Sequence, residues 1–209
     1  MKKCVILASM PAADSLRHWC EGADLLIAAD AGWRQAKAWG LCPDILLGDY
    51  DSAPMPEHLP EQTLLRLPAE KDDTVTHCAA RQAIAAGCTQ AVILGGLGGR
   101  LDHTLANMNT LLFLAQHGVQ AVLADEGVEV RALLPGAHIL PARPGWYCSL
   151  FPAQGRVEGL WLENLKYPLQ NAVLTAHWPV GVSNEFLEGP ARIRFAKGAL
   201  YCVLCRKER

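Results

Sequence analysis

The sequence predicts a doubly wound, mainly parallel α/β domain over residues 1–125, followed by a small antiparallel β-sandwich domain over residues 126–209. Three observations lead to this prediction. Through residue 125, short apolar runs rich in β-forming residues alternate with helical patterns. Beyond it the helical periodicity disappears, and brief apolar runs are separated by Gly and Pro. All ten Asp residues of the chain also lie between Asp14 and Asp125, which indicates two parts with different roles.

In the first part, the short apolar runs are typical of strands that helices bury on both faces. Helices are expected where apolar residues recur at helical spacing, and Gly40, Gly87 and Gly118 are placed to end three of them. We therefore expect strands at residues 4–8, 24–29, 45–47, 63–67, 91–94 and 120–124, and helices at 13–21, 32–39, 73–86 and 101–116. This alternation predicts a parallel sheet.

In the second part, evenly spaced short runs with turn residues between them predict an antiparallel sandwich or barrel. The expected strands are residues 128–133, 138–140, 147–151, 159–162, 172–175, 191–195 and 200–205. A domain of about 84 residues with one-sided sheets would leave apolar surface that needs cover, which is consistent with an oligomer.

Charge and cysteine content exclude several classes of protein. The formal net charge of −2 removes bulk attraction to nucleic acid or to an anionic membrane. No stretch approaches the ~20 apolar residues of a membrane span, and the short run after Met1 predicts a first strand rather than a signal peptide. The eight cysteines lie in apolar runs and are expected to be free, buried thiols. We expect a cytoplasmic protein.

Aspartates follow several of the predicted strands. Asp30 follows the second strand, Asp49 and Asp51 follow the third, and Asp72 follows the fourth. Asp102 comes shortly after the fifth. Because the carboxyl ends of parallel strands share one edge of a sheet, these carboxylates are expected to gather there and to need a cation. Hard oxygen ligands suit Mg²⁺, which binds one or two carboxylates together with substrate phosphates.

The glycine-rich segment at residues 95–99 lies between a strand and a helix, where bare N–H groups and a helix N-terminus favour an anion. It is not a Walker A loop, because no Gly-Lys-Ser/Thr occurs, and it is not GxGxxG, because the sixth position of that pattern is Leu101. Arg100 adds a fork of donors that suits phosphate, and His103 is a further candidate to bind it. The residues alone thus predict a Mg²⁺-dependent enzyme that handles a nucleotide di- or triphosphate.

Four segments occur in an order and at separations that resemble the thiamine pyrophosphokinase family. They are Gly48-Asp49-Tyr50-Asp51-Ser52, Lys71-Asp72-x-Thr74, Gly95-Gly96-x-Gly98-Gly99-Arg100-x-Asp102-His103 and Ser183-Asn184-Glu185-Phe186. The resemblance implies transfer of a diphosphoryl group from ATP to the hydroxyl of thiamine, giving thiamine diphosphate and AMP. It also implies a homodimer, with thiamine between one subunit's α/β domain and its partner's β domain.

The resemblance also implies roles for single residues. The metal ligands would be Asp49, Asp51, Asp72 and Asp102, and the catalytic residues Asp51, Asp72, Arg100 and Asp102. ATP would be held by Asp30, Gly95, Gly96, Gly98, Gly99, Arg100 and His103. Thiamine would be bound by Ser183, Asn184 and Tyr201, the last by stacking. Either Asp51 or Asp102 would take the hydroxyl proton.

One position departs from the family pattern: its Lys-Asp-x-Thr-Asp ends here in Val75. Either Asp73 substitutes for the missing carboxylate, or one metal or substrate contact is absent. Two other interpretations stay open, a diphosphokinase for another alcohol such as a hydroxymethylpterin and a non-catalytic thiamine or nucleotide sensor. A dinucleotide-dependent oxidoreductase is disfavoured because GxGxxG is absent.

Overall fold

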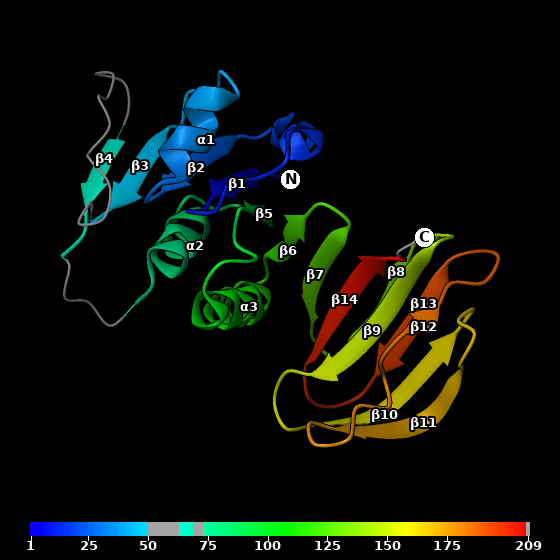
Figure 1. Cartoon of the computed structure of the whole chain (residues 1–209). Helices are drawn as coiled ribbons and strands as arrows, with labels where there is room; N and C mark the ends of the chain where they lie inside the picture. Colours follow the sequence, from blue (N-terminus) through cyan, green and yellow to red (C-terminus); the bar gives the residue numbers. More distant parts are fainter. Residues whose placement is uncertain (50–62, 69–72, 208–209) are drawn as a thin grey trace. The chain divides into compact units, whose positions relative to one another are not determined.

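The computed structural model describes residues 1–49, 63–68 and 73–207, and the chain divides into two compact units, Met1–Glu126 and Gly127–Arg209. Figure 1 traces both units along the chain. No helix of the described residues is long and apolar enough to cross a membrane. The eight cysteines, all within the described ranges, form no disulfide.

The first unit contains six parallel strands in the order β6-β5-β1-β2-β3-β4. Their bounds are β1 Lys3–Leu7, β2 Leu25–Ala29, β3 Ile45–Gly48, β4 Thr63–Arg66, β5 Gln90–Leu94 and β6 Gln120–Asp125. After a polar first residue in β1 and β5, these central strands are apolar and buried on both faces, and in β2 every residue is apolar and buried. This is the burial that the continuous apolar runs predicted.

Helices cover both faces of this sheet (Figure 1), as a doubly wound fold requires. A 3₁₀ helix, η1 Asp14–Cys20, and α1 Gly32–Ala38 pack on the face that contains Val5 and Leu7. The other face is covered by α2 Val75–Ala85 and α3 Leu101–Gln116. Helix α2 begins two residues later than predicted, because the Thr74 hydroxyl accepts the N–H of His77 and caps it.

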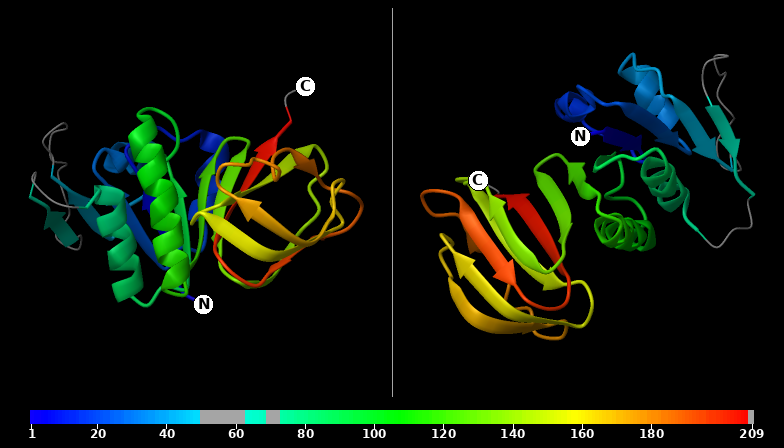
Figure 2. Two further views of the ribbon diagram at one scale, coloured as in Figure 1. Left: turned by 90° about the horizontal axis from the view of Figure 1, so that it is seen from below. Right: turned by 180° about the vertical axis from the view of Figure 1, so that it is seen from behind.

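The second unit is a pair of antiparallel sheets with the strand orders β12-β9-β14-β7 and β11-β10-β13-β8. The bounds in the first sheet are β7 Val128–Leu133, β9 Trp146–Pro152, β12 Asn184–Glu185 and β14 Leu200–Arg206. Those in the second are β8 Gly136–Leu140, β10 Arg156–Glu163, β11 Leu169–Thr175 and β13 Ala191–Phe195. The two views of Figure 2 show these strands in colours that run from green and yellow-green to red. The predicted fold class is confirmed.

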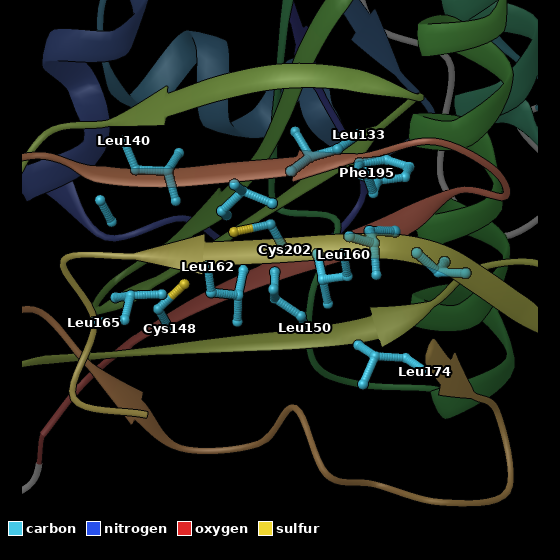
Figure 3. Close-up of a cluster of buried hydrophobic side chains, with 14 of the residues drawn as sticks. Leu133, Leu140, Cys148, Leu150, Leu160, Leu162, Leu165, Leu174, Phe195 and Cys202 are labelled. Carbon is cyan, nitrogen blue, oxygen red and sulfur yellow. The ribbon is translucent and has the colours of Figure 1, made fainter. Parts of the chain in front are cut away.

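Alternating residues of the two sheets form the core of the sandwich (Figure 3). Leu150 and Cys202 come from one sheet, and Leu160 and Ile193 from the other; each is at most 2% exposed. Such period-two burial places the intervening residues on the outer faces of the sheets. The short strand β12 was not predicted, because two residues are too few to produce a hydrophobic pattern.

Replacing Leu160 by Ala tests this core. Leu160 is fully buried, so the Leu160→Ala variant should lose about 2–5 kcal/mol of unfolding free energy, measured by urea denaturation. Val173 on the neighbouring strand is 47% exposed, and Val173→Ala should stay within about 0.5 kcal/mol of the parent. Equal losses in the two variants would contradict the described packing.

Candidate active site

Two of the predicted site residues follow adjacent strands of the first unit. Asp30 follows β2 and Asp49 follows β3, and both side chains are half-buried. The N–H of Asp30 donates to the carbonyl of Leu47 at 2.8 Å, which ties the two strand ends together. Asp30 has a φ of +48°, a left-handed conformation that Asp tolerates better than most residues. The predicted residues Asp51 and Asp72 lie outside the described residues.

The glycine-rich turn after β5 combines two kinds of glycine. Gly95 and Gly96 are buried, and a Cβ there would lie 2.1 Å from the Met10 carbonyl oxygen and 2.6 Å from a leucine methyl of β6, respectively. At Gly99 a Cβ would lie 2.8 Å from the Met10 sulfur. Only Gly98 among the four is exposed with open space around its missing side chain, and its φ is +80°. Gly98 is therefore the glycine that an anion can approach most closely, while the other three allow close packing.

Three residues that the sequence analysis did not single out hold this turn in place, Met10 through its backbone and Asn107 and Thr104 through their side chains. The Met10 N–H donates to the carbonyl of Gly95 at 3.0 Å. Asn107 on α3 is 5% exposed, and its side-chain amide donates to the carbonyl of Gly96 at 2.8 Å. The Thr104 hydroxyl donates to the carbonyl of Gly98 at 3.5 Å. Met10 comes just after β1, so inspecting the end of that strand as well would have found it. The only sign of Asn107 in the sequence is that it is a polar residue on the apolar side of a predicted helix.

Arg100 and Asp102 form a bidentate ion pair at the start of α3. Arg100 Nε and Nη2 donate to the two carboxylate oxygens of Asp102 at 3.1 and 2.6 Å. The N–H of His103 also donates to Asp102, at 3.0 Å. These hydrogen bonds, chiefly the one from Arg100, lower the pKa of Asp102, and the same pair raises the pKa of Arg100. Both side chains are more than 60% exposed, so each can exchange its partner for a ligand.

Carboxylates are the donor type that Mg²⁺ prefers, and Asp49 and Asp102 are the two of the four predicted ligands that lie within the described residues. Among residues 1–49, 63–68 and 73–207, no three His, Cys, Asp or Glu side chains form a cluster that could hold a metal. The donor set fits Mg²⁺ in its chemistry, but it depends on Asp51 and Asp72 for completion.

The departure from the family pattern lies at the start of α2. Val75 is the first residue of that helix and is 7% exposed. The carboxylate of Asp73 accepts a hydrogen bond from Arg81 Nη1 at 3.1 Å. Asp73 would therefore have to exchange this ion pair before it could replace a carboxylate at position 75.

The predicted thiamine residues Ser183 and Asn184 lie beside β9 in the second unit, where β12 pairs with Tyr147 and Cys148. Ser183 is exposed and has a φ of +59°. Asn184 is 6% exposed, and its amide makes three internal hydrogen bonds. Two are with the backbone N–H and carbonyl of Tyr167, and one is with the N–H of Glu185. Asn184 thus fixes the backbone of this segment, and Ser183 presents its side chain to solvent.

Tyr201 occupies the face of β14 opposite the sandwich core, between Ala132 and Phe151 of the neighbouring strands. It is 8% exposed, and burial raises the pKa of its hydroxyl. The carboxylate of Glu185 lies between Lys207 at 2.6 Å and Lys166 at 2.9 Å, which together lower its pKa.

Comparison with known proteins places both units in one family. Residues 16–123 match the family model described as "Thiamin pyrophosphokinase, catalytic domain". Residues 137–200 match the one described as "Thiamin pyrophosphokinase, vitamin B1 binding domain". The chain is 28% identical over 190 residues to the thiamine pyrophosphokinase of Bacillus subtilis, covering 86% of each chain.

Solved structures show the same architecture. A crystal structure of thiamine pyrophosphokinase from Bacillus subtilis superposes with a TM-score of 0.89 at 26% identity, over 100% of both chains. A crystal structure of thiamin pyrophosphokinase from Geobacillus thermodenitrificans superposes with a TM-score of 0.86 at 25% identity. The match covers 100% of this chain and 99% of the Geobacillus chain.

The ion pair at the start of α3 can be tested by titration. Because Arg100 donates to both oxygens of Asp102, the pKa of that carboxyl should lie below its ordinary value of 3.8. In Arg100→Met the pKa should rise, as followed by NMR of the carboxyl carbon. An unchanged pKa in that variant would mean that the His103 N–H, not Arg100, lowers it.

Proposed function

The chain belongs to the thiamine pyrophosphokinase family, and on that premise we propose how its residues divide the work. The enzyme makes thiamine diphosphate from thiamine and ATP, a transfer of the β,γ-diphosphoryl group that leaves AMP. The observation that carries our assignment is the start of α3, where the open glycine Gly98, the exposed Arg100 and Asp102 follow one another. Phosphate-binding donors and a metal-binding carboxylate thus share one short segment.

The α/β unit is proposed to bind ATP and Mg²⁺. Arg100, the N–H groups around Gly98 and the N-terminus of α3 would hold phosphate oxygens, with His103 and Asp30 as further ATP contacts. Asp49, Asp51, Asp72 and Asp102 would hold Mg²⁺, which neutralises charge on the phosphates when bound. Arg100 would have to release Asp102 to reach a phosphate, so that one exchange frees both a phosphate-binding cation and a metal-binding carboxylate.

Catalysis would then consist mainly of positioning and electrostatic stabilisation. The thiamine hydroxyl would lie in line with the β-phosphorus and with the oxygen of the departing AMP. Arg100 would stabilise the transferred group, and either Asp51 or Asp102 would accept the hydroxyl proton.

The β unit is proposed to supply the thiamine pocket through Ser183, Asn184 and Tyr201. Ser183 would contact the vitamin, Asn184 would hold the pocket wall through its internal hydrogen bonds, and Tyr201 would stack. We propose a homodimer in which this pocket serves the partner's α/β unit. The eight cysteines without a disulfide support a reducing, cytoplasmic compartment.

The test is an incubation with ATP, Mg²⁺ and thiamine, followed by analysis of the products. AMP and thiamine diphosphate in equal amounts are expected. ADP with thiamine monophosphate would instead indicate a simple kinase, and binding without products would indicate a sensor. A hydroxymethylpterin in place of thiamine serves as the control acceptor, and we expect no transfer to it.

The carboxylates can be tested in the same assay. Asp51→Asn and Asp102→Asn should each lower kcat on the order of 10²-fold or more, the scale of losing one pre-organised electrostatic group. Asp125→Asn serves as a matched control. Asp125 is the last residue of β6 and has no proposed role, so this variant should keep the parent rate. Near-parent turnover in both site variants would contradict the proposed role of the carboxylates.

A further inference from the structure

Ser183 has an unusual backbone conformation. Four non-glycine residues of the described chain have a positive φ: Asp30, Asn164, Asn171 and Ser183. Asp and Asn are enriched in the left-handed region because their short polar side chains stabilise it locally, whereas Ser has less of this tendency. The φ of +59° at Ser183 therefore needs support from elsewhere in the fold.

The support comes from Ser149, one strand away. Its hydroxyl oxygen accepts the N–H of Ser183 at 2.9 Å, across 34 positions of sequence. Ser149 lies within β9 and is 8% exposed, so few water molecules compete for this hydrogen bond. A side-chain oxygen, not a backbone carbonyl, thus satisfies this N–H.

Contacts on either side hold the segment against β9. On one side, the N–H of Leu150 donates to the carbonyl of Gly181 at 2.8 Å, and a Cβ at Gly181 would lie 2.3 Å from the Leu150 carbonyl oxygen. On the other side, Asn184 pairs with Cys148. Val182 and Ser183 lie between these attachments with exposed side chains, and of the two it is Ser183 whose N–H is fixed by the Ser149 hydroxyl.

We propose that Ser149 is a positioning residue for thiamine: it holds Ser183 in the left-handed conformation that presents the Ser183 side chain to the vitamin. The inference rests on the proposed function, since it takes Ser183 as a thiamine contact. Without the Ser149 hydroxyl, the segment would relax among several conformations. Only one of them binds, so affinity falls in proportion to the binding-competent fraction.

The experiment measures the Kd of thiamine by calorimetry and the KM values for thiamine and ATP. Ser149→Ala should raise the Kd and the KM for thiamine about tenfold, on the scale of one lost hydrogen bond, and leave the KM for ATP unchanged. Ser149→Thr keeps the hydroxyl and should restore both values to within about twofold of the parent. Thr110→Val removes another buried hydroxyl, which bonds the Ala106 carbonyl in α3, and should leave the thiamine Kd unchanged.

A double-mutant cycle gives a second readout. If Ser149 acts through Ser183, adding Ser149→Ala to Ser183→Ala should raise the thiamine Kd no further. Additive effects of the two substitutions on the Kd would overturn the inference. So would a Ser149→Ala variant that keeps the parent Kd and only unfolds at a lower temperature, because Ser149 would then have a purely structural role. If Ser149→Ala does not fold, Ser149→Cys, with its weaker acceptor, takes its place in the cycle. A parent protein that neither binds nor converts thiamine would instead refute the proposed function.

Discussion

The parallel pairing of β1 with β2 on one side and with β5 on the other is the interaction on which the candidate site depends. It brings the ends of these three strands to one edge, so that Met10, Asp30 and Gly95 come from distant parts of the sequence to that edge. The approach is close: a Cβ at Gly32, where α1 begins, would lie 2.0 Å from the carbonyl oxygen of Leu7. Packing alone therefore requires small residues at these points, in addition to any role they have in binding phosphate.

Charged groups in both proposed binding regions already have partners within the chain. Arg100 is paired with Asp102, and the Glu185 carboxylate lies between two lysines. An exposed pair of this kind contributes little stability, so exchanging Asp102 for a phosphate costs little. The same pair keeps the two groups oriented before substrate arrives. Backbone constraint has the corresponding role at Ser183, where a hydroxyl from a neighbouring strand maintains a conformation that serine alone would seldom adopt.

Sequence patterns predicted the strand ends well because burial on both faces leaves an apolar run that ends where the chain reaches the polar edge. Asp30, Asp49 and Gly95 were found in this way. The start of α2 was placed two residues early, since only the hydrogen bond from His77 to Thr74 identifies the cap. The separate roles of the glycines were also not predictable. Gly98 and Gly99 look alike in sequence, and they differ because the Met10 sulfur lies against only one of them.

The sequence by itself determined the two-part fold, the carboxylates and glycines at the strand ends, and the family to which the ordered motifs belong. These follow from periodicity and residue type, which are local properties of the chain. Tertiary structure alone decided which groups support the motifs: Met10 and Asn107 for the glycine turn, and Ser149 for Ser183. The physical reason is that a hydrogen bond or a close packing contact depends on the distance between atoms. Residues 34 positions apart acquire that distance only when the strands and the segments beside them are assembled.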